Sequence, residues 1–163
     1  MEVKSAEDLA ALTRDDVARR LYRYWSARRA GKSFPSRDDI DPLDFTFALG
    51  HVSLVEVFYS PLRFHYRLVS TALTEHLGYE MTGKPLDDIP EPEMRAFTRD
   101  FYTKAVDLAA PLYEAGAVVK DGRRWRHETL VLPLSADAST INMLLIYRRT
   151  DRPIVLPPGS VAR

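Results

Sequence analysis

The sequence predicts an α+β fold that combines an antiparallel sheet with several helices. Three observations lead to this prediction. A segment of helical period opens the chain, a second one separates two groups of strand-like segments, and Asp121-Gly122 offers the residues that a tight hairpin turn demands. The chain has 163 residues, which fits a single domain.

Composition narrows the classes of function. The 23 basic and 23 acidic residues cancel, so no net positive field attracts nucleic acid or an anionic membrane. The chain has no cysteine, which excludes thiol nucleophiles, thiolate metal sites and the cysteine-adduct photochemistry of flavin-binding light sensors. Residues 1–8 lack the features of a secretory signal, and no run approaches the ~20 apolar residues of a membrane span. We therefore expect a cytoplasmic protein.

The first helix is predicted over 15–29, where apolar residues recur at steps of three and four positions. Gly31 follows as a stop signal, and prolines and turn formers over 34–42 end the helical pattern. Residues 1–44 are therefore expected to form an N-terminal extension. The apolar stripe of its helix consists of Val17, Leu21, Tyr24 and Trp25.

The next segments are rich in strand-forming residues. Residues 52–58 and 64–69 are predicted to be strands, and the break at Ser60-Pro61 between them makes the pair a hairpin. Thr71 then offers an N-cap for a short helix that ends at Gly78. A loop separates this helix from the second half of the chain.

A longer helix is predicted between Pro92 and Pro111, and three strands follow it. Apolar residues fall on both faces of the last two strands, so both faces of the sheet must be covered. We expect the domain to span 45–150 and the proline-rich tail, 151–163, to be flexible. The apolar stripe of the long helix is Met94, Phe97, Phe101, Ala105 and Leu108. The three strands are 112–119, 124–134 and 141–148.

Five segments, taken in order, carry a family resemblance. They are Leu21-Tyr22-Arg23-Tyr24-Trp25 with Arg28 and Gly31, Pro35-Ser36-Arg37-Asp38-Asp39-Ile40-Asp41-Pro42, Tyr66-Arg67-Leu68-Val69-Ser70-Thr71, Leu77-Gly78-Tyr79-Glu80-Met81-Thr82-Gly83-Lys84-Pro85-Leu86, and Leu130-Val131-Leu132-Pro133-Leu134-Ser135. Together they resemble a bacterial family of small, stand-alone PAS-domain proteins. The resemblance covers roughly residues 17 to 148.

The resemblance implies a five-stranded antiparallel sheet with strand order 2-1-5-4-3 and helices on one face. It also implies a sensory or regulatory module that binds a small ligand, a partner protein or both, and that passes a change in occupancy to flanking helices. No kinase, cyclase or DNA-binding segment is recognisable, so we expect a partner protein to receive the output in bacterial signalling. The sequence names neither the ligand, nor a cofactor, nor the partner.

The sequence offers little evidence for an active site or a metal-binding site. No two of the four histidines have the close spacing of a helical metal site. His76 is closest in position to the haem-binding histidine of PAS proteins, but an exposed histidine on a short helix is the commoner outcome. His127 and Glu128 are consecutive on a strand and so face opposite sides. No glycine-flanked serine or phosphate-binding loop is present, and we expect no enzymatic activity.

Aromatic residues are the basis of the ligand pocket that we predict between the sheet and the helices. They offer flat apolar walls and a few hydrogen-bonding groups. For any one of them, filling the core is the simpler explanation. The candidate ligand-binding residues are Tyr66, Tyr79, Phe97, Phe101, Trp125 and His127.

The stripe of the first helix is the candidate interface. Its residues, Val17, Leu21, Tyr24 and Trp25, would either cover the outer face of the sheet or pair with the same helix of a second subunit in a homodimer. The sequence leaves both arrangements open.

Two further functions stay open beside the sensor. One is a small α+β enzyme with a cone-shaped cavity, which would need acid–base residues in that cavity. The expected inward positions are mostly aromatic and aliphatic, which favours sensing. The other is a purely structural interaction domain whose core is filled and whose contact surface is the helix that carries Trp25.

Overall fold

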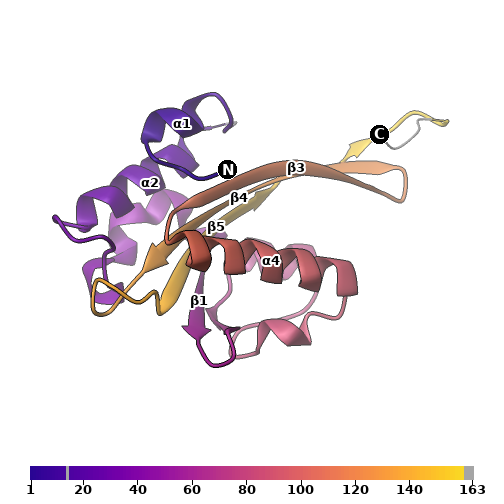
Figure 1. The fold of residues 1–163 in the computed structure, drawn as a ribbon. Coiled ribbons are helices and arrows are strands. Elements are labelled where there is room, and N and C mark those ends of the chain that lie inside the picture. Colours follow the sequence, from indigo (N-terminus) through magenta and orange to yellow (C-terminus); the bar gives the residue numbers. More distant parts are fainter. Residues whose placement is uncertain (14, 160–163) are drawn as a thin grey trace.

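The centre of the molecule is an antiparallel sheet, seen in a computed structural model that describes residues 1–13 and 15–159 (Figure 1). The strands β1 to β5 lie in the order β2-β1-β5-β4-β3, which confirms both the α+β class and the order that the family resemblance implied. The strands are β1 (Val52–Phe58), β2 (Arg63–Leu68), β3 (Leu112–Lys120), β4 (Arg123–Leu134) and β5 (Met143–Thr150).

A sixth strand lies in the segment for which the sequence predicted no regular structure. β6 (Ile154–Val155) pairs with Arg123 and Arg124 at the start of β4, beyond the end of β5. Two residues are too short to give a recognisable period in the sequence, so this strand could not be predicted.

Helices cover both faces of the sheet, as the apolar residues on both faces of β4 and β5 required. Figure 1 shows α4 along one face, and α1 and α2 on the opposite side. We call the face under α4 the inner face and the face under α2 the outer face. The α-helices are α1 (Ala6–Ala10), α2 (Val17–Arg28), α3 (Thr71–Leu77) and α4 (Pro92–Leu108). Three 3-10 helices are η1 (Arg37–Asp39), η2 (Pro42–His51) and η3 (Leu86–Asp88).

The helix α2 packs on the outer face through its buried residues. Trp25 is only 1% exposed, and its indole Nε1 donates a hydrogen bond to the carbonyl oxygen of Pro133 on β4 at 2.8 Å. Leu21 is also buried. The sequence left two arrangements open for this stripe, docking on the sheet or pairing in a homodimer. In the structure, Leu21 and Trp25 are buried on the sheet side. Val17 and Tyr24 stay partly exposed.

The outer face also buries a carboxylate. The hydroxyls of Tyr113 and Tyr147 donate hydrogen bonds to Glu128, at 2.7 and 3.3 Å. These two bonds satisfy a group that would otherwise be costly to bury. Glu128 therefore points away from the inner face, on which His127 lies, as strand alternation predicted.

Two local predictions were wrong. The N-cap of α3 is Ser70 and not Thr71, because the Ser70 hydroxyl accepts a hydrogen bond from the backbone N–H of Leu73. On α4, the predicted stripe is wrong in part: Phe97 and Leu108 are exposed, and Tyr102, which it left out, is buried. Ala105 is buried as predicted, and Met94 and Phe101 pack against the core. The Tyr102 ring packs edge-on against Phe64, and this contact sets which side of the helix faces the sheet.

The hairpin between β3 and β4 turns at the predicted dipeptide. Asp121 and Gly122 both have positive φ, 52° and 67°, as a two-residue turn that follows the strand twist requires. The hairpin extends past the end of β5, so its tip overhangs the inner face (Figure 1). Among the residues that the structure describes, no helix is long and apolar enough to cross a membrane.

Candidate ligand-binding cleft

The floor of the candidate site follows from strand register. On the inner face, Glu114 of β3 pairs with Thr129 of β4, which pairs with Arg148 of β5. The next inward row is Gly116, His127 and Thr150, and Val118 opposite Trp125 forms the third. Because directly opposed residues of antiparallel strands point to the same face, these rows form one continuous surface.

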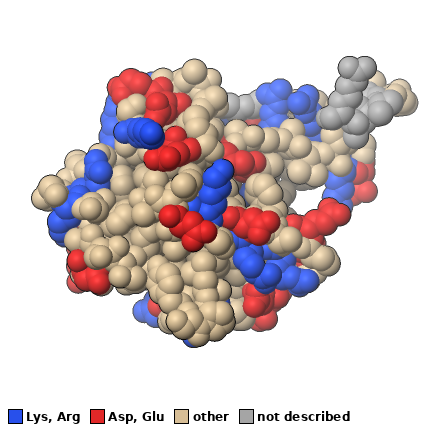
Figure 2. All heavy atoms as spheres, viewed as in Figure 1, with Lys and Arg blue, Asp and Glu red and all other residues tan. Residues whose placement is uncertain are grey.

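The roof comes from the two α-helices on the inner face. α3 contributes His76 and Leu77, and the first half of α4 contributes Met94, Phe97 and Thr98. Between roof and floor lies a cleft of about 760 Å³. Figure 2 shows a hollow beneath the β3–β4 hairpin, with acidic and basic side chains on its rim.

Three of the six predicted ligand-binding residues line this cleft: Phe97, Trp125 and His127. Phe97 is 50% exposed although it is a large apolar residue, because it sits at the mouth of the cleft and not in the core. Trp125 lies in the floor and packs against the His76 ring, with centroids 5.4 Å apart. The three therefore come together from one helix and one strand.

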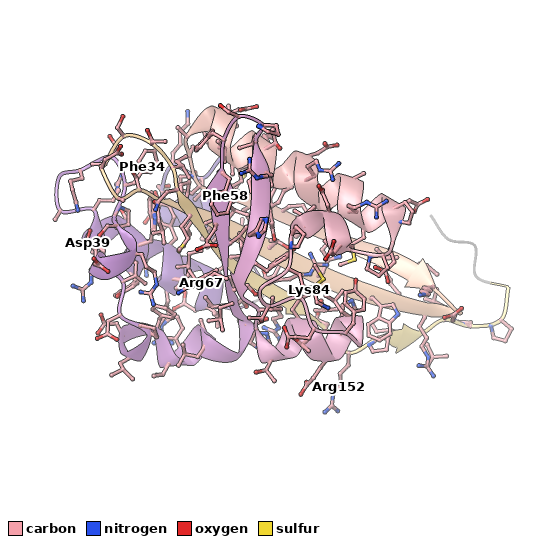
Figure 3. The ribbon with its side chains drawn as sticks, turned by 90° about the horizontal axis from the view of Figure 1, so that it is seen from below. Phe34, Asp39, Phe58, Arg67, Lys84 and Arg152 are labelled. Carbon is pink, nitrogen blue, oxygen red and sulfur yellow. The ribbon has the colours of Figure 1, made fainter. Side chains whose placement is uncertain are left out.

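Tyr66 and Phe101 lie deeper. They line a small internal cavity of about 30 Å³, together with Phe97 and Arg148, which also face the cleft. Tyr66 is held by its backbone: its N–H donates to the carbonyl of Lys84, and its carbonyl accepts from Gly83. Figure 3 shows the segment of Lys84 running beside the β1–β2 hairpin.

The phenol of Tyr66 contacts another protein side chain, and the cavity beside Tyr66 is too small for a ligand. The Tyr66 phenol interacts with the phenol of Tyr102, and burial raises the pKa of both groups, that of Tyr102 strongly. Tyr79 lies outside both cavities, and its hydroxyl donates to Glu91 at 2.7 Å, at the N-terminus of α4. Desolvation and this carboxylate raise the pKa of Tyr79.

Apart from His127, the polar residues of the floor were not predicted. His127 Nε2 lies 2.8 Å from Glu114 Oε1, diagonally across the two strands. Gly116, opposite His127, leaves room for the ring, because a Cβ there would lie 3.2 Å from both Glu114 Oε1 and His127 Cε1. A glycine inside a strand often marks such a close approach, and this was the one sequence signal available.

Arg148 completes the floor. Its Nη1 donates to Thr129 Oγ1 at 3.1 Å, and its side chain borders the cleft, the deeper cavity and a third hollow beside α3. Loss of solvent around the ring lowers the pKa of His76, and the nearby charge of Arg148 lowers it further. Both effects favour the neutral form of His76 beside the cleft.

The donor set is not that of a metal centre. Among the residues that the structure describes, no group of three or more histidine, aspartate or glutamate side chains could hold a metal ion. What the cleft offers instead is a combination of aromatic walls, a histidine–carboxylate pair and a guanidinium. Such a combination fits a small organic molecule with one or a few polar groups.

Comparison with known proteins identifies the fold family. A sequence model described as the PAS domain matches residues 14–146, which is most of the chain. The chain belongs to the PAS domain family. The cleft thus lies between the sheet and the helices of a PAS domain, a type of domain that serves as a sensory module.

Two solved structures resemble this PAS domain distantly, and both are LOV proteins. A variant of RsLOV is 14% identical, with 68% of this chain and 69% of that chain covered and a TM-score of 0.43. A fungal LOV domain photoreceptor is 16% identical, with 70% and 94% covered and a TM-score of 0.41. No curated protein sequence matches the chain.

Proposed function

We propose that this PAS domain is a sensor that binds a small organic molecule in the cleft of the inner face and passes its occupancy to a partner protein. The observation that carries the proposal is the cleft itself. Its volume of about 760 Å³ lies within the range of roughly 300–1,000 Å³ that is usual for small-molecule sites. The exposed Phe97 at its mouth gives a ligand an apolar surface to cover.

The proposal assigns different roles to the predicted ligand-binding residues. Phe97, Trp125 and His127 are the expected ligand contacts because they line the cleft. Tyr66 and Phe101 are expected to support the site from beneath, since the cavity that they line holds only about 30 Å³. Tyr79 is expected to position Glu91 at the cleft rim through its hydrogen bond.

Mass spectrometry of the natively purified protein tests the proposal. Under native conditions we expect a complex, and under denaturing conditions we expect the same small molecule to be released. Phe97→Ala should lower the bound fraction, because it removes apolar surface at the cleft mouth. Leu108→Ala is the matched control: Leu108 is 46% exposed on the same helix, but it lies outside the cleft. Equal occupancy in the two variants would contradict the proposed site.

The same experiment separates the sensor from an enzyme. The pair of His127 and Glu114 in the floor is the kind of acid–base group that the enzyme alternative needs, and it is the observation that favours this second candidate. A sensor returns its ligand unchanged after prolonged incubation at high protein concentration. Conversion of the released molecule, abolished by His127→Ala, would favour the enzyme.

The surface that we propose for a partner is the exposed side of α2 and the adjoining η2. Tyr24 is partly exposed there and donates to Asp44, and Leu43 is 77% exposed. We expect a homodimer through this face. Light scattering should then give twice the monomer mass, and Leu43→Asp should reduce it to the monomer mass. A monomer at every concentration would contradict the homodimer.

A further inference from the structure

We propose that the ligand of the cleft is an aromatic monocarboxylate and that Arg148 binds its carboxylate group. This inference rests on the proposed function, because it names the ligand class of the same site. The observation behind the inference is the environment of the Arg148 guanidinium.

Arg148 is a partly buried cation without a counter-charge among the described residues. Every ion pair found within 4.0 Å in residues 1–13 and 15–159 involves other side chains. Its Nε is shielded from solvent and has no hydrogen-bond partner there. Among the described residues, the Arg148 side chain makes one hydrogen bond, from Nη1 to the neutral Thr129 hydroxyl. A guanidinium has five N–H donors, so most of its bonding capacity is unused.

The groups around Arg148 do not compensate its charge. Three hollows meet at this side chain, and the deepest is lined mainly by apolar residues. Glu75 and Asp151 border the hollow beside α3, but no ion pair joins either of them to Arg148 within 4.0 Å in the described residues. The nearest acid in the floor, Glu114, lies two strands away across Thr129, about 10 Å at the usual strand spacing. Glu114 is also engaged with His127. An unpaired charge in such a setting is costly, and an anionic ligand would remove the cost.

The shape and charge of the cleft select the kind of anion. The planar fork of an arginine matches a carboxylate with two parallel hydrogen bonds. Trp125 and Phe97 supply flat apolar walls for an aromatic body. Within the described part of the chain, the lining of the cleft holds four acids and, with Arg148, three cations, so a ligand with a single negative charge fits better than a polyanion. The acids are Glu91, Glu93, Glu114 and Asp121, and the other two cations are Lys120 and Arg123.

Three small probes of similar shape test the inference by calorimetry: phenylacetate, its neutral isostere phenylacetamide, and phenyl phosphate. We expect phenylacetate to bind the wild-type protein more tightly than either of the others. Arg148→Met should weaken phenylacetate binding by about 10- to 100-fold, because a charge-assisted hydrogen bond is lost. The same variant should leave the affinity for phenylacetamide unchanged. Arg67→Met, an equal change of charge at an exposed position on β2, is the control and should change neither affinity.

Stability of the unliganded protein separates a ligand-binding arginine from a structural one. Because Arg148 has no ion-pair partner within the part of the chain that the structure describes, Arg148→Met should unfold at the same urea concentration as the wild type or at a higher one. A clear loss of stability, with phenylacetate and phenylacetamide binding equally, would mean that Arg148 only supports the fold. Tighter binding of phenyl phosphate would overturn the assignment to a monocarboxylate.

The failure of this inference can be told from failure of the proposed function. If the native protein releases a ligand but phenylacetate binds no better than phenylacetamide, the carboxylate assignment is wrong and the sensor stands. If no molecule is released and none of the three probes binds, both are wrong.

Discussion

Gly116 lies opposite His127 in the β3–β4 ladder, in the floor of the cleft. Because it has no side chain, the His127 ring can lie close to the backbone of β3. A Cβ at this position would lie 3.2–3.3 Å from Glu114 and from the ring. Gly116→Ala should therefore displace the ring and lower the free energy of unfolding by about 1 kcal/mol. Gly50→Ala is the control, because no heavy atom lies within 4 Å of its added Cβ and its φ is not positive. Urea denaturation and the NMR shifts of the imidazole would measure both effects, and identical behaviour of the two variants would refute the steric argument.

Trp25 is buried on the outer face, and its indole donates one hydrogen bond. Trp25→Ala should cost about 3–5 kcal/mol of stability through the cavity that it leaves. Trp25→Phe keeps most of the packing but leaves the Pro133 carbonyl without its donor, which should cost about 1–3 kcal/mol. Tyr24→Phe removes an exposed hydroxyl on the same helix and should cost less than either. A melting temperature for Trp25→Ala equal to that of the wild type would contradict this account.

Some residues of the cleft could be predicted from their residue type. The others could be identified only from the register of the strands. Phe97, Trp125 and His127 could be proposed because aromatic residues favour ligand pockets. Arg148 and Glu114 could not, because both read as ordinary polar residues of a strand. Glu114 and Arg148 lie in one row of the floor because each is paired with Thr129 of β4 in the sheet.

At the scale of the element, α3 illustrates how a helix end is selected. Two hydroxyl residues, Ser70 and Thr71, stand at its start, and the sequence alone favoured the second. Ser70 adopts the extended backbone of an N-cap and bonds to Leu73, and its own N–H is satisfied by Ser53 on β1. That long-range contact is what local sequence could not supply.

The two hydroxyls make a matched pair of substitutions. Ser70→Ala should lower the free energy of unfolding by about 0.5–2 kcal/mol, because the N–H of Leu73 loses its acceptor. Thr71→Ala, at the first helical residue and exposed, should change it by less than about 0.5 kcal/mol. Thermal melts of both variants decide the question, and a larger loss for Thr71→Ala would mean that the cap is misassigned.

The strands and their period were easier to predict than the orientation of α4. Alternation and the Asp121-Gly122 turn define strands locally, and the family resemblance implied their order. The buried side of α4 depends instead on the contact between Tyr102 and Phe64, which are far apart in the sequence. The stripe therefore included Phe97 and Leu108, which are exposed, and left out the buried Tyr102.

At the scale of the whole molecule, the buried pair of Tyr66 and Tyr102 links stability to alkaline pH. Burial raises the pKa of both phenols above 10, so the folded state holds protons that the unfolded chain releases. The stabilisation is complete below pH 10 and is lost progressively as pH rises above 10. The urea midpoint should therefore fall between pH 9 and pH 11. Tyr102→Phe removes one of the two groups and should show a smaller fall, and an equal fall in both proteins would exclude this pair as the cause.

Both tryptophans report on the whole domain, because one lies on each side of the sheet. Trp125 is in the floor of the cleft, and Trp25 is buried on the outer face. Two-dimensional ¹H–¹⁵N NMR resolves two indole signals, which substitution of either residue would assign. On addition of the molecule released from the native protein, or of phenylacetate, we predict that the Trp125 signal shifts while the Trp25 signal stays in place. A titration in which the Trp125 signal does not move, or in which only the Trp25 signal moves, would contradict ligand binding in the cleft.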